Sequence, residues 1–125
     1  MMSNKSQEKD WKLFRSRLPA WQESYMDRLN HQYIQLLSSE GKPSEKFWAL
    51  DQRIREDQKS VGVQVYIRRS QVKPILLRLL SEGVITLNDL EGFSDELRQD
   101  LSDDMETWKE QEMNDGIDGD EDLQP

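Results

Sequence analysis

The amino-acid sequence predicts an all-α protein, a small helical domain of about five helices with one extended, strand-like segment near 61–67. Apolar residues recur at spacings of three and four over most of the chain, which is the period of an amphipathic helix. Helix-starting residues precede these runs, and Gly or Pro follows several of them. A chain of 125 residues fits one domain. We expect that domain to cover residues 10–111, between a flexible segment 1–9 and a disordered acidic tail 112–125.

The first two helices are separated by Pro19 in this prediction. Asp10 is suited to cap a short first helix. The apolar residues of that helix are Trp11, Phe14 and Leu18. Proline is tolerated in the first turn of a helix, so Pro19 is expected to open the second helix, near 20–39. Gly41 then ends this helix.

A third helix is expected near 43–58, with Ser44 as its cap. The short connection makes the second and third helices antiparallel neighbours, and we expect this hairpin to bury their aromatic faces. The stripe of the second helix comprises Trp21, Tyr25, Leu29, Tyr33 and Leu37, and that of the third Phe47, Leu50 and Ile54. The candidates for either the core or a partner-binding surface are Trp21, Tyr25, Tyr33 and Trp48.

Residues 61–67 break the helical pattern. Valine or isoleucine occupies every second position of this segment, which is the period of a half-buried strand. No second strand is evident to pair with it. The segment is therefore either an extended linker lying on the helices or an edge that pairs with another chain, and the second option would make the protein an oligomer.

Two further helices are expected near 70–82 and 94–110, capped by Ser70 and Ser94. Gly83 is predicted to end the first of them in the left-handed conformation. A short helix lies between them, and its capping box is formed by Thr86 and Asp89. The buried stripe of the first helix comprises Val72, Ile75, Leu76, Leu79 and Leu80, and that of the second Leu97, Leu101, Met105 and Trp108.

Charge is divided unevenly along the chain. The formal net charge is -8, and 34% of the residues are charged, against about 25% in a typical globular domain. Residues 1–80 hold 15 Lys and Arg and 9 Asp and Glu, whereas residues 81–125 hold 2 and 16. Two halves of opposite sign predict either an attraction within the molecule or two faces for different partners.

A basic strip within residues 68–78 stands out from its acidic surroundings. Its four cations are Arg68, Arg69, Lys73 and Arg78. They could contact an anion or nucleic acid, since the amides of a helix start also attract phosphate, but four charges give weak, salt-sensitive binding. We favour a second interpretation, in which carboxylates of the helix near 94–110 pair with the strip. In a third, the acidic tail covers the strip until a partner displaces it.

The sequence offers no recognisable catalytic or metal-binding motif. It has no Cys, and its one histidine, His31, has no second histidine at helical spacing. The tail resembles a calcium loop only in part, because Pro125 falls where a bidentate Glu is required. We expect no enzyme and no cofactor. Without an apolar run of about 20 residues or an apolar leader, we also expect a cytoplasmic protein that does not enter membranes.

Three blocks carry a family resemblance: "LPAWQESYMDRLNHQYIQLL", "PSEKFWALDQRIREDQKSVGV" and "LLSEGVITLNDLEGFSDELR". Over roughly residues 11–101 they resemble a family of small uncharacterised proteins of Gram-positive bacteria, often carried on mobile elements. Some relatives bear the label "multidrug transporter", which a sequence without a membrane segment does not support. The resemblance implies no catalytic residues. "GVITLNDL" is also similar to the turn of short helical-hairpin domains that mediate oligomerisation or docking.

Two hypotheses of function follow. The first is a non-enzymatic helical protein-interaction module that acts through its aromatic hairpin or its strand-like edge. The resemblance would make it a regulatory or accessory factor of a mobile element. The second is a nucleic-acid-associated protein, either a weak binder through the basic strip or an acidic mimic, formed by residues 81–125, that occupies another protein's nucleic-acid site.

Overall fold

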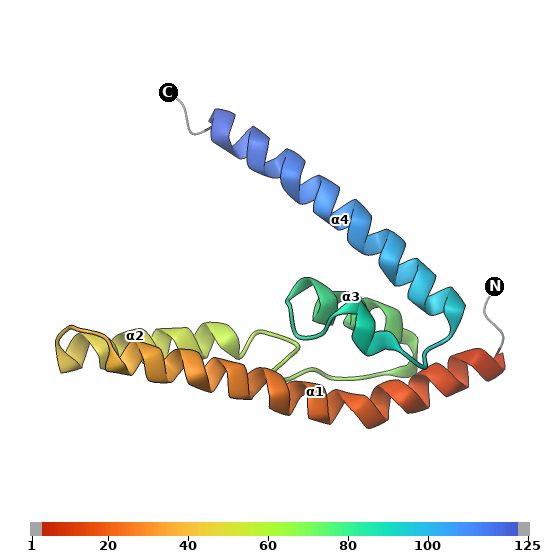
Figure 1. Cartoon of the computed structure of the whole chain (residues 1–125), viewed down its shortest axis with the longest axis horizontal. Helices are drawn as coiled ribbons and strands as arrows, with labels where there is room; N and C mark the ends of the chain where they lie inside the picture. The colour runs from red at the N-terminus through yellow and green to blue at the C-terminus, as the bar shows by residue number, and fades with distance from the viewer. Residues whose placement is uncertain (1–3, 123–125) are drawn as a thin grey trace.

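The computed structural model describes the backbone of residues 4–122 and the side chains of residues 5–113. Over this part of the chain the protein forms four α-helices and two short 3₁₀ helices, with no strand. In order they are α1 (Asn4–Ser38), α2 (Pro43–Asp57), η1 (Arg69–Gln71), α3 (Val72–Ser81), η2 (Leu87–Leu90) and α4 (Asp95–Asp122). The all-α prediction is confirmed, whereas the count of about five helices is not (Figure 1).

The first two predicted helices are one helix, α1, which spans 35 residues and continues through Pro19. Proline removes one helical hydrogen bond and bends the axis, and Figure 1 shows α1 changing direction in its N-terminal half. Burial on both sides of the proline, at Leu18 and Leu29, keeps the chain helical across the bend. The helix already begins at Asn4, inside the segment predicted as flexible.

The hydrophobic core lies where the N-terminal half of α1, α3, η2 and the start of α4 meet (Figure 1). Helix α3 is central to it, and its predicted apolar face is buried throughout. The largest apolar side chains that are fully enclosed are Phe14, Leu76, Leu79, Leu90 and Leu101. They come from α1, α3, η2 and α4, so the core depends on the mutual position of these elements.

A buried carboxylate joins α1 to α4. Asp10 is 2% exposed and accepts hydrogen bonds from the backbone N–H of Ser94 at 2.8 Å and from its hydroxyl at 2.7 Å. The Ser94 hydroxyl oxygen in turn accepts from the N–H of Leu97 at 3.3 Å, so the predicted cap at Ser94 is confirmed. Asp10 caps no helix of its own, because α1 has begun two turns earlier.

Other helix ends agree with the sequence only in part. The Thr86 N–H donates to the Asp89 carboxylate at 2.7 Å, and Gly83 has φ of +76°, as predicted. Ser44 and Ser70 were predicted as caps and are not. A proline opens α2, η1 leads into α3, and the residues before these two helices make no side-chain cap bond.

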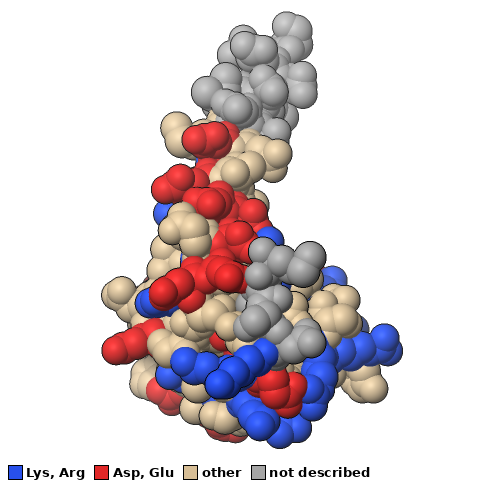
Figure 2. All heavy atoms as spheres, turned by 90° about the vertical axis from the view of Figure 1, so that its right-hand side faces the viewer, with Lys and Arg blue, Asp and Glu red and all other residues tan. Residues whose placement is uncertain are grey.

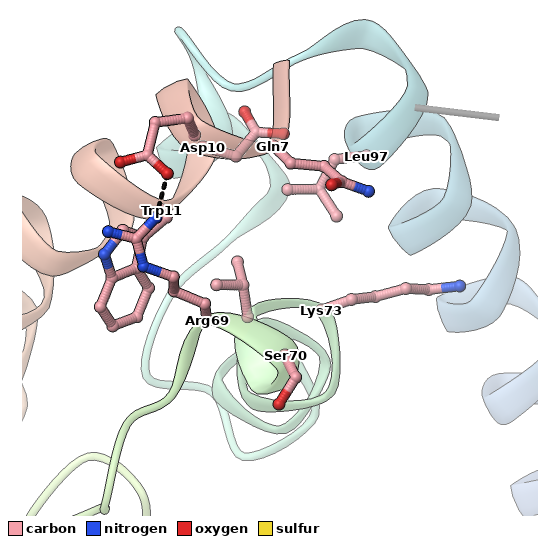
Figure 3. A pocket seen from close by; sticks show the side chains of 9 residues that line it. Gln7, Asp10, Trp11, Arg69, Ser70, Lys73 and Leu97 are labelled. Carbon is pink, nitrogen blue, oxygen red and sulfur yellow. Dashed lines mark hydrogen bonds and ion pairs between the residues drawn. The ribbon is translucent and has the colours of Figure 1, made fainter. Parts of the chain in front are cut away.

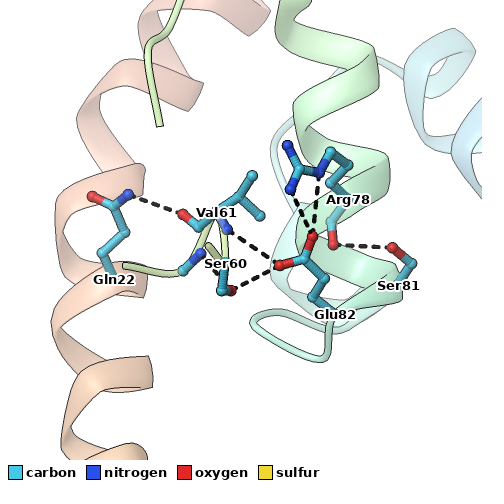
Figure 4. Close-up of polar contacts among 7 residues, drawn as sticks. Gln22, Ser60, Val61, Arg78, Ser81 and Glu82 are labelled. Carbon is cyan, nitrogen blue, oxygen red and sulfur yellow. Dashed lines mark hydrogen bonds and ion pairs between the residues drawn. The ribbon is translucent and has the colours of Figure 1, made fainter. Parts of the chain in front are cut away.

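The segment after α2 is held between α1 and α3 (Figure 4). The Glu82 carboxylate of α3 accepts from the Ser60 hydroxyl at 2.8 Å and from the Val61 N–H at 3.2 Å. From α1, Gln22 Nε2 donates to the Val61 carbonyl at 3.0 Å. These bonds give the connection a defined path across the core.

Packing along this segment explains its alternating residues. A Cβ on Gly62 would lie 2.3 Å from the Tyr25 ring, so only glycine fits there. Val65 and Ile67 pack against the core, while Tyr66 is exposed. The strand prediction is not confirmed, because no ladder forms among residues 4–122. Pairing of this segment with another chain stays a prediction.

Helices α1 and α2 form the predicted antiparallel hairpin, but it does not bury the predicted aromatic face. The Tyr33 hydroxyl donates to the Asp57 carboxylate at 2.5 Å, and Leu29 is buried. Phe47 and Trp48 are exposed. The prediction is wrong for these two because the hairpin extends beyond the core, where no other helix covers it (Figure 1).

Helix α4 leaves the core after Leu101. Met105 is half-buried, whereas Trp108 is 38% exposed, so the predicted buried stripe ends one turn early. The helix continues to Asp122, across most of the segment 112–125 predicted as a disordered tail. That tail is therefore not confirmed. Its last three residues lie outside the described part of the chain.

The Tyr33–Asp57 bond gives the hairpin a pH dependence. Burial and the hydrogen bond to Asp57 raise the pKa of Tyr33 to about 12. The pKa of an unfolded tyrosine is about 10, so this stabilisation is complete below that pH and is lost as pH rises through 12. We expect Tyr33→Phe to flatten the fall in unfolding free energy over this window. Denaturant unfolding at several pH values measures it, and identical slopes in both proteins would contradict it.

Candidate functional site

The four cations of the basic strip lie at the exposed side of η1 and α3. Lys73 contacts α4, with its Nζ 3.3 Å from the Asp104 carboxylate and 3.8 Å from that of Asp100. This is the internal pairing predicted for the helix near 94–110. All three groups are exposed, so the pairs add no more than about 1 kcal/mol each.

Arg69 pairs with a carboxylate that the sequence did not point to. Its guanidinium forms an ion pair with Glu8. It also lies 5.6 Å from the centre of the Trp11 ring (Figure 3). Glu8 falls in the segment predicted as flexible. No local pattern could have joined the two residues, because 61 positions separate them.

Arg78 and Arg68 complete the strip differently. Arg78 Nη2 lies 3.1 Å from the carboxylate of Glu82, four residues further along the chain. The same carboxylate accepts hydrogen bonds from Ser60 and Val61 in the segment after α2 (Figure 4). Arg68 lies 5.1 Å from the centre of the Tyr66 ring. It has no ion pair with any carboxylate in the described part of the chain. Three of the four cations are therefore neutralised internally.

A pocket of about 510 Å³ opens beside this strip, between the start of α1, η1, α3 and α4 (Figure 3). Its polar lining includes Asp10, Arg69 and Lys73. Both Asp10 oxygens accept hydrogen bonds from Ser94, and both cations have carboxylate partners. An anion entering the pocket would have to compete with Glu8 and the α4 carboxylates.

Two arginines of α1 serve the fold. Arg17 Nη1 donates to the carbonyls of Asp89 and Glu91, at 3.1 and 2.5 Å. Arg28 Nη2 donates to the carbonyls of Gly83 and Val84, each at 3.0 Å. These carbonyls lie in the last residues of η2 or just after η2 and α3, where helical carbonyls lack partners. Part of the basic surplus of residues 1–80 is thus committed to holding the later elements.

Acidic side chains line α4 where it rises from the body of the molecule (Figure 2). Residues 95–113 of this helix hold eight Asp and Glu and two Lys and Arg. Lys and Arg gather on the body below it in the same view. The acidic surface of α4 over residues 95–113 is therefore separated from most of the basic surface of the body, although Lys73 contacts α4.

His31 is exposed on α1, with its Nδ1 2.8 Å from the carbonyl of Asp27. Among residues with described placement, no group of three or more His, Cys, Asp or Glu could hold a metal ion. The partial calcium loop begins at residue 114, beyond the described side chains. No helix in the described range has the length and apolar character needed to cross a bilayer.

The four candidate aromatic residues have different environments. Trp21 stacks on Phe93, with ring centres 6.4 Å apart, and Tyr25 packs against the core. Tyr33 is committed to Asp57. Only Trp48 is mainly exposed.

Four exposed apolar residues lie in the last turns of α1 and the first turns of α2, at the end of the hairpin. Phe47 meets Trp48 edge to face, with ring centres 5.0 Å apart. Lys46 Nζ donates to the Leu37 carbonyl at 3.2 Å, which holds the first turn of α2 against the last turn of α1. The hairpin-end residues, with their exposed fractions, are Ile34 (60%), Leu37 (46%), Phe47 (63%) and Trp48 (64%). Sequence periodicity had assigned Leu37 and Phe47 to buried stripes.

No protein-family model, curated protein or solved structure matches this chain.

The pairing of the basic strip predicts that the protein ignores nucleic acid. We expect no shift of DNA or RNA in a gel at about 0.15 M salt, because three of the four cations already have carboxylate partners and α4 repels a polyanion. Binding that weakens steeply with salt would contradict this, provided that Arg68→Ala with Arg69→Ala abolishes it. The matched control is Arg53→Ala with Arg55→Ala on α2, which should leave such binding unchanged.

Proposed function

We propose that this protein is a non-enzymatic helical protein-interaction module that docks a protein partner through its hairpin-end residues. One observation carries the proposal: four large apolar side chains are 46–64% exposed at a single end of the hairpin. Large apolar side chains left exposed in one part of a surface mark interaction sites in soluble proteins. Burying it against a partner is favourable because apolar area leaves water.

The hairpin is suited to present these side chains. Tyr33 of α1 bonds to Asp57 of α2, and the Arg53 guanidinium of α2 donates to the Gln32 side chain of α1, so the two helices are joined by polar contacts as well as by packing. A rigid surface loses little conformational entropy when it binds. Phe47 and Trp48 are of the aromatic type that contributes most at interfaces, and an apolar groove on the partner would accommodate them.

The nucleic-acid hypothesis has weaker support. A direct binder would use the basic strip, where Arg69, Lys73 and Arg78 are held by carboxylates. An acidic mimic would use α4, and its row of carboxylates is the feature that favours this second candidate (Figure 2). A role on a mobile element stays an expectation drawn from the sequence resemblance.

Replacing Phe47 and Trp48 by Ser tests the proposed surface. We expect the double variant to keep the melting temperature of the unchanged protein, since both side chains are exposed, and to lose its partner. A photoreactive amino acid at position 48, introduced in the native host, should cross-link to a protein. The same group at position 66, which is also exposed and aromatic, is the matched control. Equal cross-linking from both positions, or from neither, would contradict the proposal.

A further inference from the structure

We infer that the hairpin-end residues bind a second copy of this chain, in a two-fold symmetric contact. This inference rests on the proposed function, since it names the partner of the same surface. Two observations support it: the balanced charge that borders the hairpin-end residues, and the net negative charge of the rest of the molecule.

The border of the hairpin end carries balanced charge. Two acidic and two basic residues lie in the turn between α1 and α2 and in the first turn of α2: Glu40, Lys42, Glu45 and Lys46. Glu40, Lys42 and Glu45 are exposed, and none of them has an ion pair with another described residue. Two copies can therefore meet here without bringing a surplus of one sign together.

The rest of the surface opposes contact between copies. The protein carries a net charge of -8, and α4 holds the densest group of carboxylates. The turn between α1 and α2 lies at one extreme of the molecule, whereas α4 begins at the other extreme and runs back above the body (Figure 1). Salt screens exposed charges beyond about 8 Å at physiological ionic strength, so copies that meet through the hairpin end keep the acidic first turns of their α4 helices out of range.

A second exposed apolar group lies on α4 and is less suited to a second copy. Trp108 and Met113 are exposed, but Glu106, Glu110 and Glu112 lie among them on the same helix. Two such surfaces would bring like charges together, which costs several kcal/mol at an interface. A partner for α4 would have to be basic.

Two-fold symmetry fits the composition of the hairpin end. In such a contact each copy presents the same surface, so Lys42 of one can face Glu45 of the other, and the reverse pair forms at the same time. Phe47 and Trp48 supply the apolar centre, with the charged residues as its rim. Each copy thus carries both the basic and the acidic residue of the ion pair, so a second copy of the same chain can complete it.

Sedimentation velocity of the full chain tests this inference. At about 0.1 mM protein we expect a dimer with a Kd in the micromolar range, as for a small interface. Phe47→Ser with Trp48→Ser should give a monomer. Tyr66→Ser with Leu87→Ser removes exposed apolar residues elsewhere and should leave the dimer intact. Because the rim is balanced, Kd should change less than about threefold between low and high salt.

A charge-pair experiment tests the symmetry. Phe47→Asp and Phe47→Lys each place like charges across the contact, so each alone should be monomeric. Mixed together they should form a heterodimer, because the two position-47 side chains then carry opposite charges. In the control mixture of Phe47→Asp with Tyr66→Lys, the Tyr66→Lys chain should form its own dimer and the Phe47→Asp chain should stay monomeric. A wild-type chain that is monomeric at about 0.1 mM, or a mixture that fails to associate, would overturn the inference.

Failure of the inference differs from failure of the proposed function. A monomer whose position-48 photoreactive group still cross-links to another protein in the host would overturn self-association and leave the hairpin end a docking surface. A dimer that survives Phe47→Ser with Trp48→Ser would place self-association elsewhere and overturn the inference.

Discussion

Asp10 is the residue through which the two ends of the fold are joined. Its carboxylate is almost fully buried and has both oxygens occupied by Ser94, one by the backbone amide and one by the hydroxyl. A buried carboxylate is tolerated only where hydrogen bonds replace its water. Ser94 caps α4 at the same time, so this one contact fixes where α4 begins and how it sits on α1.

The placement of α4 determines the charge pattern of the molecule. Because Asp10 holds the start of α4, the first turns of this helix pack on α3 through Leu97 and Leu101. The carboxylates of α4 then come within reach of Lys73. Beyond these turns the helix diverges from the body (Figure 1). The acidic start of α4 thus lies at the opposite end of the molecule from the hairpin turn (Figure 1). The exposed apolar residues of the hairpin end and the acidic first turns of α4 can coexist in a chain of this size because the fold keeps them apart.

Local signals in the sequence predicted local features well. The cap at Ser94, the Thr86–Asp89 box and the buried face of α3 follow from patterns within a few residues. The error at Pro19 arose because tertiary burial outweighed a local helix-breaking preference. Periodicity shows which face of a helix is apolar but not whether another element covers it. Phe47 was therefore assigned to the core, and Glu8 was missed because its partner is distant in sequence.

A double-mutant cycle on Asp10 and Ser94 tests the central contact most directly. The unfolding free energies of Asp10→Ala, Ser94→Ala and the double variant give the coupling between the two residues. If the buried bond fixes α4 on α1, the coupling should be about 1–3 kcal/mol, with each single change destabilising because it leaves a buried partner unsatisfied. Single changes that add within about 0.5 kcal/mol would contradict the account, since the two residues would then act independently.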